Sequence, residues 1–230
     1  MIPTAIIFDL DDTLYLELEY VRSGFRAVAT SLSENLNINA QAVEAEFNRL
    51  YHAGFKTDTF NRWLQQSGFG IGFLNRMLDT YRNHQPQIVP MPDVVECLPR
   101  LSADYSIGLV SDGRAVTQQY KWKALKLAGW FDSVIFSDML GREYWKPHPL
   151  PFLTAAKQLN VEPSRCVYVG DNPFKDFAGA RAAGMTSVRI RRMNGLHYNV
   201  EACSDGQANA EITDLRGLSE ALDAISKGSI

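Results

Sequence analysis

The sequence predicts an α/β protein, with a Rossmann-like parallel sheet, helices on both faces and an all-helical insertion after the first strand. Short, nearly all-apolar runs recur along the chain, and the later ones alternate with segments whose apolar residues repeat every three or four positions. Strands that are apolar on both sides and alternate with helices are typical of a parallel sheet covered on both faces. The 230-residue length suits one large domain with a smaller domain inserted into it.

The apolar runs are the expected strands. They are Ala5–Phe8, Ser106–Val110, Ser133–Phe136, Cys166–Val169, Thr186–Ile190 and a last short run at Ala210–Ile212. Helical periodicity predicts helices over Val116–Leu127, Phe152–Leu159 and Leu218–Ile225. Pro149 and Pro151 suit the first turn of a helix, and Gly129 and Gly184 suit helix C-termini. A stop signal therefore follows the first of these helices, and start signals precede the second.

Residues from about 16 to 84 break the alternation of strand and helix. Their apolar positions follow helical periodicity only, as in Val21, Phe25, Val28 and Leu32, and glycines and asparagines separate the periodic stretches. A proline-rich stretch over residues 83–92 indicates a loop that returns to the sheet. We therefore expect an all-helical insertion between the first and second strands.

Composition excludes several classes of protein. With 46% hydrophobic and 21% charged residues, the chain is neither a disordered segment nor a fibrous repeat. The net charge of −3 argues against a general nucleic-acid binder. Arg189, Arg191 and Arg192 form the one basic cluster of note, and we interpret them as a solvated edge. We expect no nucleic-acid partner.

The cysteines and the N-terminus bear on the cellular compartment. The three cysteines are widely spaced and form no CxxC pair, so they predict free thiols in a reducing environment. The first residues lack the basic region of a signal peptide, and no run approaches the about 20 apolar residues of a membrane span. We expect a cytoplasmic protein without a membrane partner, as a monomer or homodimer.

Three carboxylates follow the first strand within four residues, in Asp9-Leu10-Asp11-Asp12-Thr13. Asp and Thr are common in polar turns, so the segment could be only a turn. In an extended segment, however, residues two apart face the same way, and Asp9 and Asp11 would converge. A hard cation such as Mg²⁺ takes oxygen ligands and would relieve their repulsion.

Reactive side chains also follow the other strands. Ser111-Asp112-Gly113 comes after the second strand, Lys146 lies in a loop after the third, and Gly170-Asp171 precedes Asp176 after the fourth. Taken singly, each could be a cap or an exposed loop residue. Ligands of open parallel sheets bind beyond the carboxyl ends of the strands, so these side chains are expected to form one site.

These motifs resemble those of the haloacid dehalogenase-like hydrolase superfamily, whose members are mostly phosphatases. The resemblance covers nearly the whole chain and rests on the 9–13 motif, Ser111, Lys146 and the Gly170-Asp171…Asp176 motif. The helical insertion resembles the small cap of that family. The resemblance implies a catalytic core of residues 1–15 and 88–230 and a cap domain of residues 16–87.

The resemblance implies a phosphatase that acts through an aspartyl-phosphate. Asp9 would be the nucleophile, and Asp11 would protonate the leaving alcohol and then deprotonate the attacking water. The role of Asp11 requires a carboxyl whose pKa is raised by burial or by negative neighbours. Lys146 would neutralise charge between Asp9 and the phosphate. Thr13 would orient the nucleophile loop by hydrogen bonding.

The resemblance also implies the binding residues. Ser111, with the backbone of Asp112 and Gly113, would hold the phosphoryl oxygens. The expected Mg²⁺ ligands are Asp9, the backbone carbonyl of Asp11, Asp171 and, as a ligand or close neighbour, Asp176. Many relatives have Asn where this chain has Asp112, and a charge there is unfavourable unless it turns away or pairs with Arg114 or Lys121.

Other functions of the same fold stay open. A haloacid dehalogenase uses the nucleophile but needs neither Asp11 nor Mg²⁺, because a leaving halide needs no proton. A phosphomutase would share all four motifs. A non-enzymatic binding module is disfavoured because every motif is intact. The expected substrate is a small soluble phosphomonoester, either a nucleotide or a sugar phosphate, selected by the cap and by the turn that holds Tyr15 and Glu17.

Overall fold

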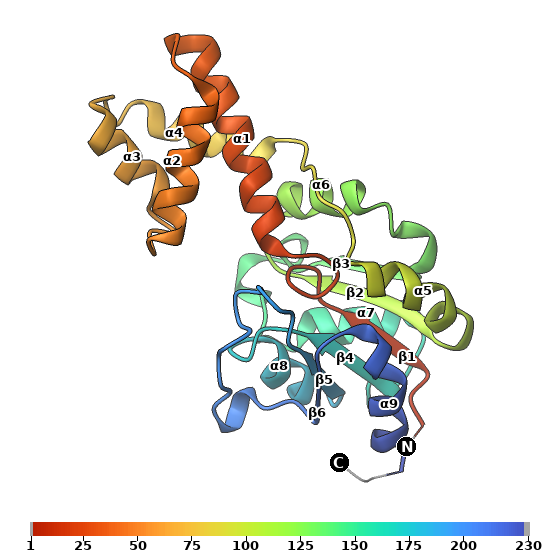
Figure 1. The fold of residues 1–230 in the computed structure, drawn as a ribbon. Helices are drawn as coiled ribbons and strands as arrows, with labels where there is room; N and C mark the ends of the chain where they lie inside the picture. The colour runs from red at the N-terminus through yellow and green to blue at the C-terminus, as the bar shows by residue number, and fades with distance from the viewer. Residues whose placement is uncertain (1, 228–230) are drawn as a thin grey trace. The chain divides into compact units, whose positions relative to one another are not determined.

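A six-stranded sheet is the centre of the α/β unit in the computed structural model, which describes residues 2–227. The chain divides into two compact units. One consists of residues up to Glu17 together with those from Val89 onward, and the other is Leu18–Ile88. Figure 1 shows the course of the chain through both.

The sheet is wholly parallel, as predicted. Its strands are β1 (Ala5–Phe8), β2 (Ser106–Ser111), β3 (Ser133–Phe136), β4 (Cys166–Gly170), β5 (Thr186–Ile190) and β6 (Ala210–Ile212). They lie in the order β3-β2-β1-β4-β5-β6, and every neighbouring pair is parallel. The chain builds the sheet first to one side of β1 and then to the other. The order therefore reverses between β1 and β4, which is where such sheets bind ligands.

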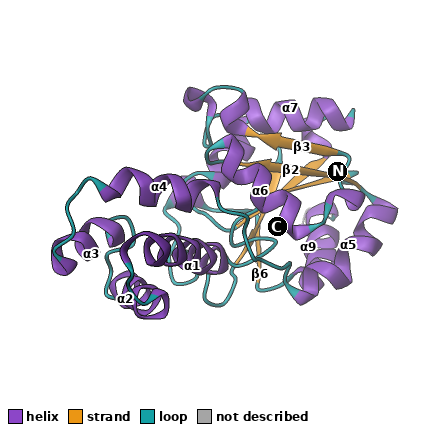
Figure 2. Ribbon diagram, turned by 90° about the horizontal axis from the view of Figure 1, so that it is seen from above, coloured by secondary structure: helices purple, strands orange, loops and turns teal. Residues whose placement is uncertain are grey.

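Helices cover both faces of the sheet (Figure 2). They are α5 (Pro92–Asp104), α6 (Ala115–Leu125), α7 (Leu150–Leu159), α8 (Asp176–Ala182) and α9 (Leu218–Ser226). On one face, Ala5 and Ile7 join a buried cluster with Phe152 and Ala156 of α7. Successive strand residues point to opposite faces, so β1 is buried on both sides, as its AIIF sequence predicted.

The helical unit has a core of its own. It contains α1 (Glu17–Leu36), whose first residue belongs to the α/β unit, and α2 (Ala40–His52), α3 (Thr59–Ser67) and α4 (Phe73–Asn83). The predicted helical periodicity is confirmed, because the aromatic rings of Phe25, Phe47, Phe60 and Trp63 pack edge-on or tilted in one apolar cluster. No helix between residues 2 and 227 combines the length and the apolar character that a bilayer crossing requires.

One of the two glycine predictions is wrong. Helix α6 ends earlier than expected, with Lys126 in the left-handed conformation at φ +56°, and Gly129 lies in the following 3-10 turn, Ala128–Trp130. Gly184 fulfils its prediction. It follows α8 with φ +82°, and its N–H donates to the carbonyl of Arg181.

The arginine cluster is not a solvated edge. Arg189 is fully buried, and its guanidinium donates to the carbonyls of His197 and Val200 at 2.9 and 2.7 Å. Arg192 is also buried and forms an ion pair with Asp93. The prediction failed because a charged side chain can be buried when carboxylate or carbonyl oxygens accept from at least some of its donors, as they do from Arg189 Nη2 and from Arg192, and the sequence does not reveal those partners.

Candidate active site

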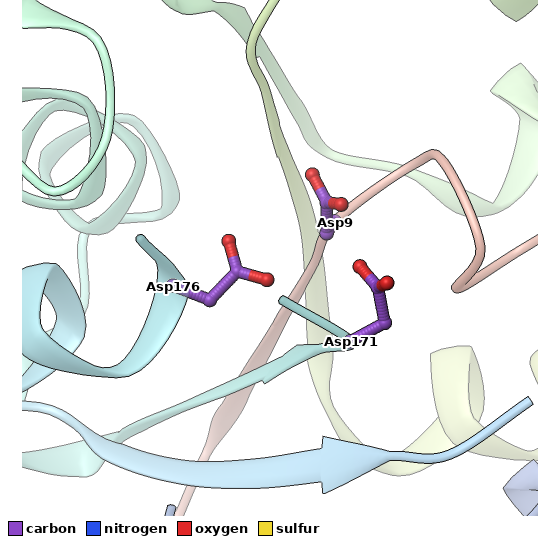
Figure 3. A group of neighbouring side chains, drawn as sticks. All are labelled: Asp9, Asp171 and Asp176. Atoms are coloured by element: carbon purple, nitrogen blue, oxygen red, sulfur yellow. The ribbon is translucent and has the colours of Figure 1, made fainter. Parts of the chain in front are cut away.

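Three buried carboxylates meet where the strand order reverses. Asp9 comes directly after β1, Asp171 directly after β4, and Asp176 begins α8. One oxygen of each lies within 4.8 Å of the others (Figure 3). The β1–β4 pairing holds the first two side by side, since the Asp9 N–H continues the ladder to the carbonyl of Val169 at 2.8 Å. Folding thus gathers acids that are far apart in the sequence.

Lys146 lies beside this cluster and is itself buried. Its Nζ is 2.6 Å from Asp9 Oδ1 and 2.8 Å from Asp176 Oδ1, and it donates to the Tyr168 hydroxyl at 2.9 Å. One ammonium group therefore faces three carboxylates, counting Asp171. The cluster keeps a negative charge in a place where water is largely excluded.

The pKa values of the three acids differ, because one lysine shares its positive charge among them unequally. Burial raises the pKa of Asp9 to about 6 in spite of the attraction of Lys146. Burial also raises the pKa of Asp171, and the charges of Asp176 and Asp9 raise it further. For Asp176, burial acts in the same direction, but the attraction of Lys146 outweighs it and the pKa is lowered.

A hard divalent cation fits this group of ligands. Mg²⁺ prefers oxygen ligands and would offset the excess negative charge of Asp9, Asp171 and Asp176. The side chain of Asp11 is not part of the group, so of the expected metal-binding set the structure brings together three carboxylates. A contribution from the Asp11 backbone carbonyl stays a prediction.

The Asp11 carboxylate has its own set of partners. Lys121 Nζ lies 2.7 Å from Oδ1, Gln118 Nε2 lies 2.9 Å from Oδ2, and the Tyr15 hydroxyl also donates to Oδ1. Burial would raise the pKa of Asp11, but Lys121 and these hydrogen bonds outweigh burial and lower it. The expected upward shift of this pKa is wrong, because the sequence does not reveal that Lys121 is buried against the Asp11 carboxylate.

Ser111 and Gly113 lie next to these partners. The Ser111 hydroxyl is fully buried and accepts a hydrogen bond from Gln118 Nε2 at 2.7 Å. Gly113 has φ +124°, and a Cβ there would lie 3.1 Å from the Gln118 side chain. The positive φ therefore favours a glycine for the turn, and a Cβ at this position would also press on the Gln118 side chain.

Similarity to known proteins identifies the family. A family model described as "Haloacid dehalogenase-like hydrolase" matches residues 6–190. A protein named glyceraldehyde 3-phosphate phosphatase, from Methanopyrus kandleri, is 34% identical over 212 residues, which are 87% of this chain and 88% of the relative. The chain belongs to the haloacid dehalogenase-like hydrolase family.

Solved structures agree with this hydrolase assignment. A haloacid dehalogenase-like (HAD) phosphatase from Thermococcus onnurineus has a TM-score of 0.61 at 29% identity, and the match covers 95% of this chain and 97% of that one. A 2-haloacid dehalogenase from Pseudomonas syringae pv. Tomato DC3000 has a TM-score of 0.66 at 26% identity, covering 98% of this chain and all of that one. Both phosphatases and dehalogenases therefore share the fold of this hydrolase.

Thr13 lacks the hydrogen bond expected of it in this hydrolase, and the structure gives the partners of Asp112, which the sequence left open. The Thr13 hydroxyl is buried and has no hydrogen-bond partner among the described residues, so it does not orient the loop in the expected way. The Asp112 carboxylate accepts hydrogen bonds from the Ser137 hydroxyl and from the Lys146 N–H, and Lys175 Nζ lies 3.6 Å away. These donors and the lysine stabilise the negative charge of Asp112.

Sequence reasoning missed several polar groups of this site. Gln118 lies within a segment that was interpreted only by its apolar periodicity, and Tyr168 lies within an apolar strand. Lys121 was considered only as a partner of Asp112. Tyr15, which was suggested as a substrate contact, is fully buried and bonds to Asp11. One signal was available: Gln118 and Lys121 are three residues apart, so they share a helix face, shortly after Ser111.

Proposed function

We propose that this hydrolase is a Mg²⁺-dependent phosphatase that cleaves small phosphomonoesters through a phosphorylated Asp9. The observation that carries the proposal is the convergence of Asp9, Asp171 and Asp176 with Lys146, at the point where the strand order reverses. A phosphate monoester is a dianion, and attack by a carboxylate is opposed until charge is neutralised. Here the ammonium group of Lys146 pairs with the carboxylate of Asp9, the attacking group.

In the first step, an oxygen of Asp9 forms a bond to phosphorus and the bond from phosphorus to the alcohol oxygen breaks. The alcohol leaves with a proton from Asp11. The hydrogen bonds of Asp11 in the structure suit its carboxylate form. The negative charge of an incoming phosphate favours the protonated form, because like charges raise the pKa of a carboxyl.

In the second step, water attacks the phosphorus of the aspartyl-phosphate and gives its proton to Asp11. The bond between phosphorus and Asp9 breaks, which releases inorganic phosphate and restores Asp9. Ser111 would hold phosphoryl oxygens during both steps, and Lys146 would offset the charge on Asp9. Asp9, Asp171 and Asp176 would hold Mg²⁺, which, when bound, offsets the negative charge of the phosphoryl group.

We infer a small sugar phosphate as the substrate class. The family resemblance left nucleotides and sugar phosphates open. The support for sugar phosphates is that the Methanopyrus kandleri relative, whose match covers most of both chains, is named a glyceraldehyde 3-phosphate phosphatase. We also infer a reducing, cytoplasmic location, since Cys97, Cys166 and Cys203 are free thiols. A monomeric or homodimeric state stays a prediction.

The test is phosphate release with Mg²⁺ from p-nitrophenyl phosphate and from glyceraldehyde 3-phosphate. Asp9→Asn should lower turnover by at least about 10³-fold, because an amide cannot replace the nucleophile. Asp104→Asn makes the same chemical change at an exposed position and should leave turnover unaltered. Undiminished Mg²⁺-dependent turnover by a folded Asp9→Asn protein would rule out the proposed nucleophile.

The likeness to a 2-haloacid dehalogenase makes halide release the second function to test. A dehalogenase has no need of a proton donor for its leaving group, yet here Lys121, Gln118 and Tyr15 all bind Asp11. We therefore expect no chloride release from 2-chloropropionate. Isomer formation from a sugar phosphate, followed beside phosphate release, distinguishes a mutase from a hydrolase.

A further inference from the structure

The inward face of α6 is polar where a helix on a sheet usually buries apolar residues. Its buried residues are Gln118, Lys121 and Leu125, which are spaced to lie on one face. Val116, part of the apolar periodicity that predicted this helix, is 48% exposed. Burying a lysine and an amide is unfavourable unless each finds partners. The partners of these two side chains therefore have to be found on the side of the helix that faces the protein.

Both side chains bind Asp11. Lys121 Nζ is 2.7 Å from Oδ1, and Gln118 Nε2 is 2.9 Å from Oδ2. The Tyr15 hydroxyl donates to Oδ1 as well. Each carboxylate oxygen thus has a donor from α6, and the two contacts together fix both the position and the rotation of the carboxylate. A single contact would leave it free to turn.

Gln118 also connects Asp11 to Ser111. The same Nε2 that donates to Asp11 lies 2.7 Å from the Ser111 hydroxyl. Gly113 leaves room for this side chain, since a Cβ there would lie 3.1 Å from Gln118 Cδ. The Gln118 amide therefore links two groups of the proposed site. They are the Asp11 carboxyl, which would transfer the proton, and the Ser111 hydroxyl, which would hold the phosphoryl group.

We propose that Lys121 and Gln118 are positioning residues that hold the Asp11 carboxyl in line with the leaving alcohol, with Gln118 also setting the place of Ser111. This inference rests on the proposed phosphatase function. Proton transfer requires heavy atoms within hydrogen-bond distance, and a displacement of about 1 Å can reduce the rate by about 10²-fold. Neither residue exchanges atoms with the substrate in this scheme.

The test uses leaving groups of different acidity. Lys121→Met removes the ammonium group and keeps the length of the side chain. For glycerol 2-phosphate, whose alkoxide must be protonated, we expect kcat/KM to fall by about 10²-fold. For 2,4-dinitrophenyl phosphate, whose leaving group departs without a proton, we expect a fall of less than about threefold. The ratio kcat/KM reports the steps up to loss of the leaving group, so later hydrolysis of the aspartyl-phosphate does not mask the comparison.

Lys123→Met is the matched control, since Lys123 lies on the same helix and is exposed; both substrates should react as with the wild type. Gln118→Leu should slow both substrates, because Ser111 loses its partner too, with the larger loss for the alkyl ester. Lys121→Gln, a milder change with the same expected selectivity, replaces Lys121→Met if circular dichroism shows that the latter is unfolded.

Equal losses on the two esters, or no loss on the alkyl ester, would overturn the positioning role of Lys121. Failure of Gln118→Leu to slow the alkyl ester would overturn that of Gln118. A wild-type protein without Mg²⁺-dependent phosphatase activity would instead refute the proposed function itself, so the two failures are distinguishable.

Discussion

Of the three acids in the cluster, Asp171 is stabilised least by the positive charge of Lys146, because the Lys146 ammonium group pairs with Asp9 and Asp176. Burial raises the pKa of Asp171, and the neighbouring carboxylates raise it further. Because its pKa is higher in the folded protein than in the unfolded chain, its contribution to stability is greatest at acidic pH and is lost as the pH rises. Without metal, the ionised Asp171 should therefore destabilise the fold.

We predict that Asp171→Asn raises the melting temperature in chelator and lowers phosphatase activity. The amide removes a buried charge, so its stabilising effect should grow as the pH rises from 5 to 9. Activity should fall because the amide is a poorer Mg²⁺ ligand, and excess Mg²⁺ should restore part of it. Melting curves with and without Mg²⁺, beside an Mg²⁺ titration of turnover, measure both effects.

The exposed Asp104→Asn variant is the control for this experiment, with an unchanged melting temperature and Mg²⁺ requirement. If Asp171→Asn kept the wild-type Mg²⁺ titration, Asp171 would not be a metal ligand. If it lowered the melting temperature in chelator at pH 9, the proposed repulsion among the carboxylates would be wrong.

At the scale of elements, Arg192 joins three segments of the α/β unit. It follows β5, pairs with Asp93 of α5 at 2.6 Å, and donates to the carbonyl of Thr13, in the loop after β1, at 3.1 and 2.8 Å. Asp93 also accepts the N–H of Leu215. Removing one partner of a buried ion pair leaves the other charge unpaired, which costs about 3–5 kcal/mol.

We therefore predict that Arg192→Met lowers the free energy of unfolding by about 3–5 kcal/mol. Arg191→Met is the control, because Arg191, whose side chain is 17% exposed, pairs with the more exposed Glu201 and Glu211, at 86% and 47%. That variant should lose about 1 kcal/mol. Urea denaturation followed by circular dichroism measures both free energies of unfolding. Similar decreases for the two variants would show that the buried Arg192 pair stabilises the protein no more than the more exposed Arg191 pairs do.

These elements also mark the limits of prediction from sequence. The strands were predictable because a strand buried on both faces must be apolar throughout, as Ala5–Phe8 and Cys166–Val169 are. Helix α5 was not predicted, since its sequence PDVVECLPRLSAD mixes charges with an internal Pro99. Helix α6 was predicted for the wrong reason, because two polar residues and Leu125 form its buried face. Periodicity detects apolar faces and misses polar ones.

At the scale of the whole molecule, the part of the site that the sheet topology determines could be predicted from the sequence. Parallel strands bring their carboxyl ends to one edge, so Asp9 and Asp171 had to lie near each other once the fold class was known. The partners of Asp11 were not predictable in this way. Lys121 and Gln118 reach it through helix rotation and side-chain direction, which depend on packing that a single sequence does not specify.

The two units have separate apolar cores, one beneath α7 and one among α1, α2, α3 and α4. All three proposed Mg²⁺ ligands belong to the α/β unit. Phe47 is fully buried in the helical core, where its ring contacts those of Phe25, Phe60 and Trp63. Truncation of such a residue leaves a cavity that costs about 3–5 kcal/mol.

We predict that Phe47→Ala accelerates hydrogen exchange in residues 18–88 and leaves exchange in residues 89–227 largely unchanged. Exchange follows local opening, which is confined to a unit when its contacts are its own. Mg²⁺ should slow exchange around Asp9 and Asp171 equally in the variant and the wild type, because a ligand stabilises only the fold that binds it.

Phe152→Ala, in the core beneath α7, is the matched control and should reverse the pattern. Equal acceleration across both units by either variant would mean that they open together, and that the helical segment owes its stability to the sheet and not to its own aromatic core.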